Sequence, residues 1–168
     1  MLQFLQNASR MLNQREFIRF VRVFVALMVA LYAVGKLGKG QFIYEGEIMQ
    51  RPVGELSGFE LTWVFFGHNY AYVVIIGLAQ LAGAALLAFR RTSLLGALML
   101  FPVMFNIVAV DIFYGIPAGA TANALLFTLG LLLVCWSERA RLFKVFQLLL
   151  LPAAPGPARP LPRWKPWL

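Results

Sequence analysis

The chain has 168 residues, of which 61% are hydrophobic and 13% are charged, and its formal net charge is +8. Soluble domains carry about 45–50% apolar and about 25% charged residues, so this composition excludes an ordinary soluble domain and indicates a lipid surrounding. The charge does not indicate nucleic-acid binding, because the basic residues lie at the ends of apolar runs without a binding motif. The single cysteine, Cys135, excludes a disulfide within the chain.

The amino-terminal part predicts an amphipathic segment followed by a first membrane span. Residues 1–19 mix apolar side chains with basic and amide ones, which is typical of a cytoplasmic amphipathic segment. An apolar run from Phe20 to Leu37 follows and is close to a full span. Residues 38–69 hold several glycines, four glutamates and many aromatic side chains. This stretch is too polar to cross, and its aromatic residues favour the membrane interface, so we expect an outer loop.

Three further apolar runs are long enough to cross a bilayer. They are residues 70–89, 93–114 and 120–136. Pro102 lies in the middle of one of them, and Thr121 is the expected N-cap of the last. Because the links between these runs are only a few residues long, successive spans must be antiparallel neighbours. Residues 20–136 are therefore predicted to form an all-α, up-down transmembrane four-helix bundle.

The carboxyl-terminal part predicts a flanking helix and a tail. The apolar run within residues 137–151 is too short to cross, so we expect an interfacial amphipathic helix. Residues 152–168 are rich in proline and contain Trp164 and Trp167, which predicts an extended cytoplasmic tail. Two interpretations stay open for this tail: the tryptophans anchor it to lipid headgroups or to a partner, or it has no role.

The distribution of Lys and Arg predicts the orientation. With four spans, twelve of the fifteen basic residues fall on the side of the two termini. The remaining three are Lys36, Lys39 and Arg51. Cytoplasmic segments of membrane proteins carry the excess of basic residues. We therefore expect a multi-pass protein of the bacterial inner membrane with both termini in the cytoplasm and residues 38–69 outside.

A small set of polar residues in or beside the apolar runs is the candidate site. The set is Lys36, His68, Gln80, Asn106, Asp111 and Asn123. At a rise of about 1.5 Å per residue, all six lie between the membrane midplane and the outer surface, and they involve all four spans. Polar groups at such depths face the bundle interior. We therefore expect them to converge.

Three interpretations of this polar cluster stay open. The groups hold the helices together by hydrogen bonds, or they bind a ligand such as a quinone headgroup or a lipid, or they carry protons. The last is disfavoured because Gln80 and Asn106 do not change charge. Asp111 lies at a helix C-terminus, which disfavours a carboxylate, so we predict a Lys36–Asp111 pair. His68 has no Cys or His partner at ligand spacing, so no metal site is expected.

Several short motifs resemble the DoxX family of small bacterial and archaeal membrane proteins. The central motif is a Gly-x-x-Gln-x-x-Gly helix over residues 77–83, followed by a basic turn and a Leu-Gly-Ala helix start. The other matching residues are Gly35-Lys36-Leu37, Gln41-Phe42, Pro102-Val103-Met104 and Asn106-Ile107. The resemblance covers roughly residues 18–136. Gln80 stands where the family often has glutamate, which argues against an ionisable role there.

The resemblance implies a four-helix transmembrane bundle in the inner membrane. It also implies a link to redox or respiratory-chain complexes. The amphipathic ends and the tryptophan-bearing tail predict a subunit or scaffold of such a complex. The sequence shows no nucleophile–base set, metal cluster or phosphate loop, so we expect no catalytic site or cofactor of its own. The expected partners are the lipid bilayer and other subunits or further copies of the chain. The alternative is a quinone- or lipid-binding subunit of a membrane oxidoreductase that uses the polar cluster. A small-solute transporter is disfavoured, because the spans show no internal repeat.

Overall fold

The computed structural model describes the backbone of residues 2–39, 41–42 and 46–151, and the side chains in these ranges from residue 13 onward, apart from Met49. Every regular element in this part of the chain is a helix. The elements are α1 (Leu2–Leu37), the short 3-10 helices η1 (Glu47–Gln50) and η2 (Val53–Glu55), α2 (Gly58–Gly67), α3 (Tyr70–Ala88), α4 (Ser93–Phe113), α5 (Ala118–Ser137) and α6 (Arg139–Leu150). The prediction of an all-α protein is confirmed.

Four of the described helices are long and apolar enough to cross a membrane. They are residues Asn13–Leu37 of α1, and α3, α4 and α5. The predicted four spans are confirmed, and the chain is a multi-pass membrane protein. Helix α1 runs without a break from Leu2, so the amphipathic segment that we placed before the first span belongs to the same helix.

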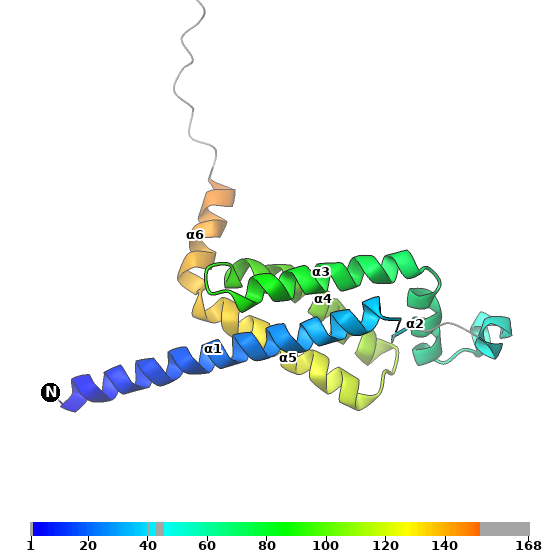
Figure 1. Cartoon of the computed structure of the whole chain (residues 1–168), viewed down its shortest axis with the longest axis horizontal. Helices are drawn as coiled ribbons and strands as arrows, with labels where there is room; N and C mark the ends of the chain where they lie inside the picture. Colours follow the sequence, from blue (N-terminus) through cyan, green and yellow to red (C-terminus); the bar gives the residue numbers. More distant parts are fainter. Residues whose placement is uncertain (1, 40, 43–45, 152–168) are drawn as a thin grey trace, which may run out of the picture. The chain divides into compact units, whose positions relative to one another are not determined.

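The four long helices form an up-and-down bundle (Figure 1). Helix α3 packs against α1 and α4, and α5 packs against α4 and α1. Helix α2 lies beside the end of the bundle where α3 begins and α4 ends (Figure 1). We call this the α2 end, and the end that holds the α3–α4 link the opposite end.

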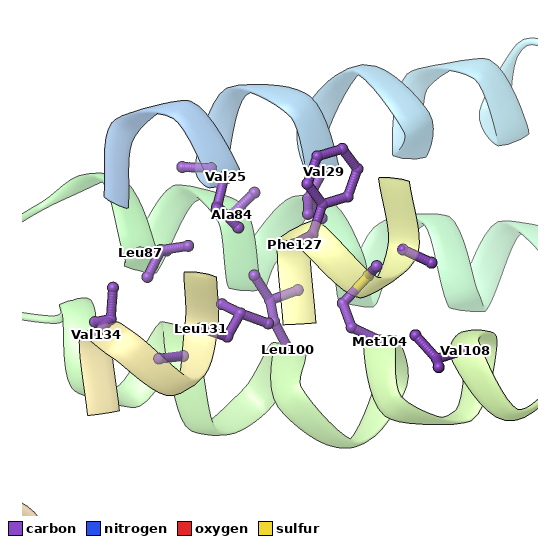
Figure 2. Packing of buried hydrophobic residues seen from close by; sticks show 13 residues of the cluster. Val25, Val29, Ala84, Leu87, Leu100, Met104, Val108, Phe127, Leu131 and Val134 are labelled. Atoms are coloured by element: carbon purple, nitrogen blue, oxygen red, sulfur yellow. The ribbon is translucent and has the colours of Figure 1, made fainter. Parts of the chain in front are cut away.

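The hydrophobic core lies between all four spans, as Figure 2 shows. Its fully buried members include Val25 and Val29 of α1, Leu87 of α3, Leu100 of α4 and Leu131 of α5. Large apolar side chains also cover the outside of the bundle, as lipid contact requires. Because lipid tails are as apolar as leucine, close packing rather than exclusion of water holds such helices together.

Two spans, α3 and α4, approach each other closely at a pair of glycines. A Cβ on Gly96 of α4 would clash with the backbone nitrogen of Leu87 and lie 2.7 Å from the carbonyl oxygen of Gly83, both on α3. A Cβ on Gly83 would lie 2.6 Å from the Leu100 side chain. Small residues permit such backbone contact between membrane helices. This contact fixes α3 and α4 together toward the opposite end.

The predicted start of α5 is wrong by a few residues. We expected Thr121 as the N-cap, but α5 begins at Ala118 after Pro117. The Pro117 carbonyl accepts hydrogen bonds from the Ala120 and Thr121 amides, at 2.8 and 3.4 Å. Proline fits just before a helix because its φ is already fixed, so the helix starts there. The Thr121 hydroxyl donates to the Ile116 carbonyl instead, at 3.4 Å.

The chain divides into a unit of residues 1–138 and a second unit that begins at Arg139. In the second unit, α6 has no buried side chain, and Phe143, Phe146 and Leu148 are exposed. Its interfacial placement stays a prediction. The proline-rich tail predicted for residues 152–168 lies outside the described residues.

We predict that Gly96→Ala destabilises the bundle by about 1–3 kcal/mol, the usual cost of overpacking a well-packed site. The added methyl meets the α3 backbone, which cannot move aside without separating the helices. Gly119→Ala is the matched control, because a Cβ there meets nothing within 4 Å. Thermal unfolding in detergent measures the difference, and a Gly96→Ala variant as stable as Gly119→Ala would contradict the proposed contact.

Candidate functional site

A cavity of about 400 Å³ lies inside the bundle toward the α2 end. Cavities that hold small ligands measure about 300–1,000 Å³. All four spans contribute to its wall, together with α2 and with Gln41 and Phe42. Its wall is mostly apolar with a few polar side chains, as expected for a ligand site.

Helix α2 lies over this cavity and contributes Thr62, Trp63 and Phe66 to its wall. At its start, Gly58 packs so tightly against Tyr114, just after α4, that a Cβ would lie 2.5 Å from the Tyr114 carbonyl oxygen. At its other end, Phe66 stacks on Tyr72 of α3 with ring centroids 6.1 Å apart. Helix α2 therefore connects the ends of α3 and α4.

The start of α2 is fixed by a capping box. The Ser57 hydroxyl accepts a hydrogen bond from the Glu60 amide, and the Glu60 carboxylate accepts one from the Ser57 amide at 2.8 Å. Arg51 donates to the same carboxylate at 2.7 Å. The hydrogen bonds from Ser57, with a smaller effect of Arg51, lower the pKa of Glu60. Such reciprocal caps satisfy amides that the first helical turn leaves unpaired.

Aromatic rings surround the polar part of the cavity. Phe42 lies between Trp63 and Phe66, with centroid distances of 5.1 and 4.9 Å. The Lys36 ammonium lies 5.9 Å from the Phe42 ring centroid and 6.0 Å from that of Tyr32. A cation near ring faces gains electrostatic stabilisation, which partly replaces the water that Lys36 has lost.

Lys36 of α1 and Asp111 of α4 both line the cavity and are buried, with exposed fractions of 4% and 9%. They interact electrostatically, but they form no salt bridge. The structure thus brings the predicted pair into one site without direct contact. Within the described residues, neither charged group has a hydrogen bond to the protein. Buried charges are costly unless partners satisfy them, so both groups are available to a ligand.

Gln80 and the two asparagines complete the polar wall. Gln80 of α3 is 1% exposed, its Nε2 lies 3.9 Å from the Met104 sulfur, and its Oε1 has no hydrogen-bond partner among the described residues. Asn106 of α4 and Asn123 of α5 also line the cavity. The Asn123 amide donates to the Tyr32 hydroxyl at 3.3 Å, which joins α5 to α1.

Five of the six predicted site residues therefore line one cavity, and His68 does not. His68 ends α2, where its backbone amide donates to the Val64 carbonyl at 3.0 Å. His68 therefore lies between α2 and α3, outside the cavity wall, and its part in a site stays a prediction. Among the described residues, no group of His, Cys, Asp and Glu is arranged to hold a metal ion.

Sequence reasoning did not assign several aromatic residues to the site. These are Tyr32, Phe42, Trp63, Phe66 and Tyr72. The aromatic residues of the outer loop were noticed only as candidates for the membrane interface. Their spacing carries no sign that a helix turns them toward the bundle interior.

The fold and the cavity define a four-span membrane protein with a partly polar cavity between its helices. The chain is 30% identical over 129 residues to the uncharacterized protein YwoB of Bacillus subtilis (strain 168), an alignment that covers 75% of this chain and 79% of that protein. The chain belongs to the same family as YwoB. No protein-family model and no solved structure matches it.

We predict that the start of α2 loosens as the pH falls through the lowered pKa of Glu60. A carboxyl whose pKa is lowered by folding stabilises the fold above its unfolded pKa and loses that contribution on protonation. Hydrogen exchange of the α2 amides measures this effect. Ser57→Ala removes the hydroxyl cap, so it should loosen the start of α2 at neutral pH as well, while its backbone amide still donates to Glu60. Glu55→Gln, outside the capping box, is the control, and a pH response of α2 that persists in Glu60→Gln would contradict the assignment.

Proposed function

We propose that this protein binds the polar head of a membrane amphiphile, a quinol or a lipid, in the cavity at the α2 end. The observation that supports the proposal is the pair of buried charges, Lys36 and Asp111, which line one cavity without hydrogen bonds to the protein within the described chain. A purely structural role for these residues predicts that they satisfy each other, as in other membrane bundles. A ligand that bridges them satisfies both.

The unsatisfied groups define what such a head must offer. Lys36 only donates hydrogen bonds, so the head needs an acceptor. The Asp111 carboxylate and the Gln80 Oε1 accept, so the head also needs a donor. The rings of Phe42, Trp63 and Phe66 favour a flat or cationic group. A hydroquinone or a zwitterionic lipid headgroup with a primary ammonium meets these requirements, whereas an oxidised quinone ring only accepts.

We predict that the purified protein carries such an amphiphile. Lys36→Met and Asn106→Leu should each lower its occupancy about tenfold, which corresponds to a loss of about 1.4 kcal/mol of binding free energy. Lys39→Met is the matched control, because Lys39 is near in the chain, lies 5.1 Å from the Tyr70 ring centroid and does not line the cavity. Mass spectrometry of the solvent extract measures quinols and lipids per protein. Equal occupancy in Lys36→Met and Lys39→Met would contradict the proposal.

The second candidate function is that of a DoxX-like subunit or scaffold of a redox-linked membrane complex. It is supported by α6, which exposes Phe143, Phe146 and Leu148 and has no buried side chain of its own. Other subunits or a second copy of the chain are the partners proposed for this helix. The same purification separates the candidates: a stoichiometric protein partner together with an empty cavity would favour the scaffold.

We also propose that the protein lies in the bacterial inner membrane with both termini in the cytoplasm. The distribution of basic residues supports this orientation. We predict that in a Cys135→Ser background, an impermeant thiol reagent labels Gly54→Cys in intact cells and labels Arg90→Cys only after lysis. Both positions are exposed, and a Cβ at Gly54 meets nothing within 4 Å. The reverse pattern of labelling would show the opposite orientation.

A further inference from the structure

We propose that the amphiphile reaches the cavity from the bilayer, between α3 and α4 and beneath α2, and that its apolar tail stays in this opening when the head is bound. The inference rests on the proposed function, because it assumes that the cavity holds a polar head. It adds that the site selects molecules with a tail, and it assigns the route by which they enter.

The register of α3 and α4 indicates an opening between them toward the α2 end. The two helices are antiparallel and meet at Gly83 and Gly96. Residues seven apart lie on the same face of a helix, two turns along. Two turns toward the α2 end from this contact, Ile76 of α3 therefore faces Val103 of α4. Both line the cavity, so the helices that touch at the glycines are separated by open space two turns away.

Part of the cavity wall formed by α3 and α4 is exposed on the outside of the bundle. Tyr72 of α3 is 45% exposed, and Pro102 and Asn106 of α4 are exposed, yet all three line the cavity. A residue that both lines a cavity and is exposed on a membrane span marks a place where the cavity meets the lipid. Figure 1 shows the ends of α3 and α4 apart at the α2 end. Pro102 also removes one backbone hydrogen bond of α4 at this level.

Contacts between elements cross the other sides of the cavity. Helix α2 lies over the cavity through the contacts of Gly58 with Tyr114 and of Phe66 with Tyr72. On the α1–α5 side, Tyr32 and Asn123 are also exposed and line the cavity, but there the Asn123 amide donates to the Tyr32 hydroxyl at 3.3 Å and joins the two helices across their seam. The opening between α3 and α4 therefore faces lipid rather than water.

The chemistry of the wall orients a molecule that enters this way. Ile76, Val103 and Ile107 form an apolar path. The buried charges are those of Lys36 on α1 and of Asp111 near the carboxyl end of α4. A head that moves inward exchanges apolar for charged contacts, and a tail left in the path keeps apolar ones. This arrangement suits a molecule with one polar head and one long tail.

Two neighbouring isoleucines allow a matched test. Ile76 lines the cavity, whereas Ile75 is 64% exposed and does not. Ile76→Trp places an indole in the tail path, and Ile75→Trp places the same indole in the surrounding lipid. Binding is measured by native mass spectrometry of the full chain in maltoside detergent. The probes are a decyl-substituted hydroquinone with its tail-less analogue, and lysophosphatidylethanolamine with glycerophosphoethanolamine.

We expect Ile76→Trp to bind the tailed probe of one pair at least about tenfold more weakly than Ile75→Trp does, and to bind the tail-less probe equally well. The pair that responds identifies the head as a quinol or a phospholipid. Equal binding of the tailed probe by the two variants would overturn the route while leaving the site intact. Loss of the tail-less probe in Ile76→Trp as well would also overturn it, because the head site itself would then be disturbed.

Failure of the proposed function gives a different result, since the wild-type protein would then bind neither pair. If Ile76→Trp does not give a monodisperse protein, the same comparison is made from the opposite wall. Val103→Trp places the indole in the path from α4, and Phe105→Trp, at a side chain exposed on the same helix, is its control. Equal binding by these two variants overturns the route in the same way.

Discussion

The contact of α3 with α4 at Gly83 and Gly96 is the constraint on which the rest of the structure depends. It fixes the two helices at backbone distance, where no side chain larger than hydrogen fits. At the α2 end, α2 packs against the ends of the same two helices and lies over the cavity. The α3–α4 pair is in backbone contact at one level and lines the cavity at another. The remaining core contacts are made by apolar side chains of all four spans.

The cavity brings together groups that an apolar bundle does not ordinarily bury. The side chains of Lys36 and Asp111 are both buried, and within the described part of the chain neither forms a salt bridge. Aromatic rings near the Lys36 ammonium and the electrostatic interaction with Asp111 offset part of the cost. Two opposite charges that line one cavity without pairing are what the proposed ligand site requires, whereas a purely structural pair would be in direct contact.

Particular residues show how far sequence reasoning reached. The four spans followed from composition and run length, because a run of about twenty apolar residues matches the thickness of the hydrocarbon core of a bilayer. Five of the six polar residues proposed for the site meet in one cavity, since depth along a helix is a linear function of residue number. Thr121 was misplaced as a cap because Pro117 starts the helix earlier. His68 does not line this cavity, because depth alone does not tell which way a side chain turns at the end of a helix.

The sequence by itself determined the membrane character, the number of spans and the position of each polar group along its span, since these depend only on the length and order of apolar runs. The tertiary structure alone decided that α2 forms over the bundle, that its aromatic residues enter the wall, and that Lys36 and Asp111 share a cavity without pairing. These features depend on rotation of each helix about its axis and on contacts such as Gly58 with Tyr114. Residues far apart in the chain set them, so no local pattern contains them.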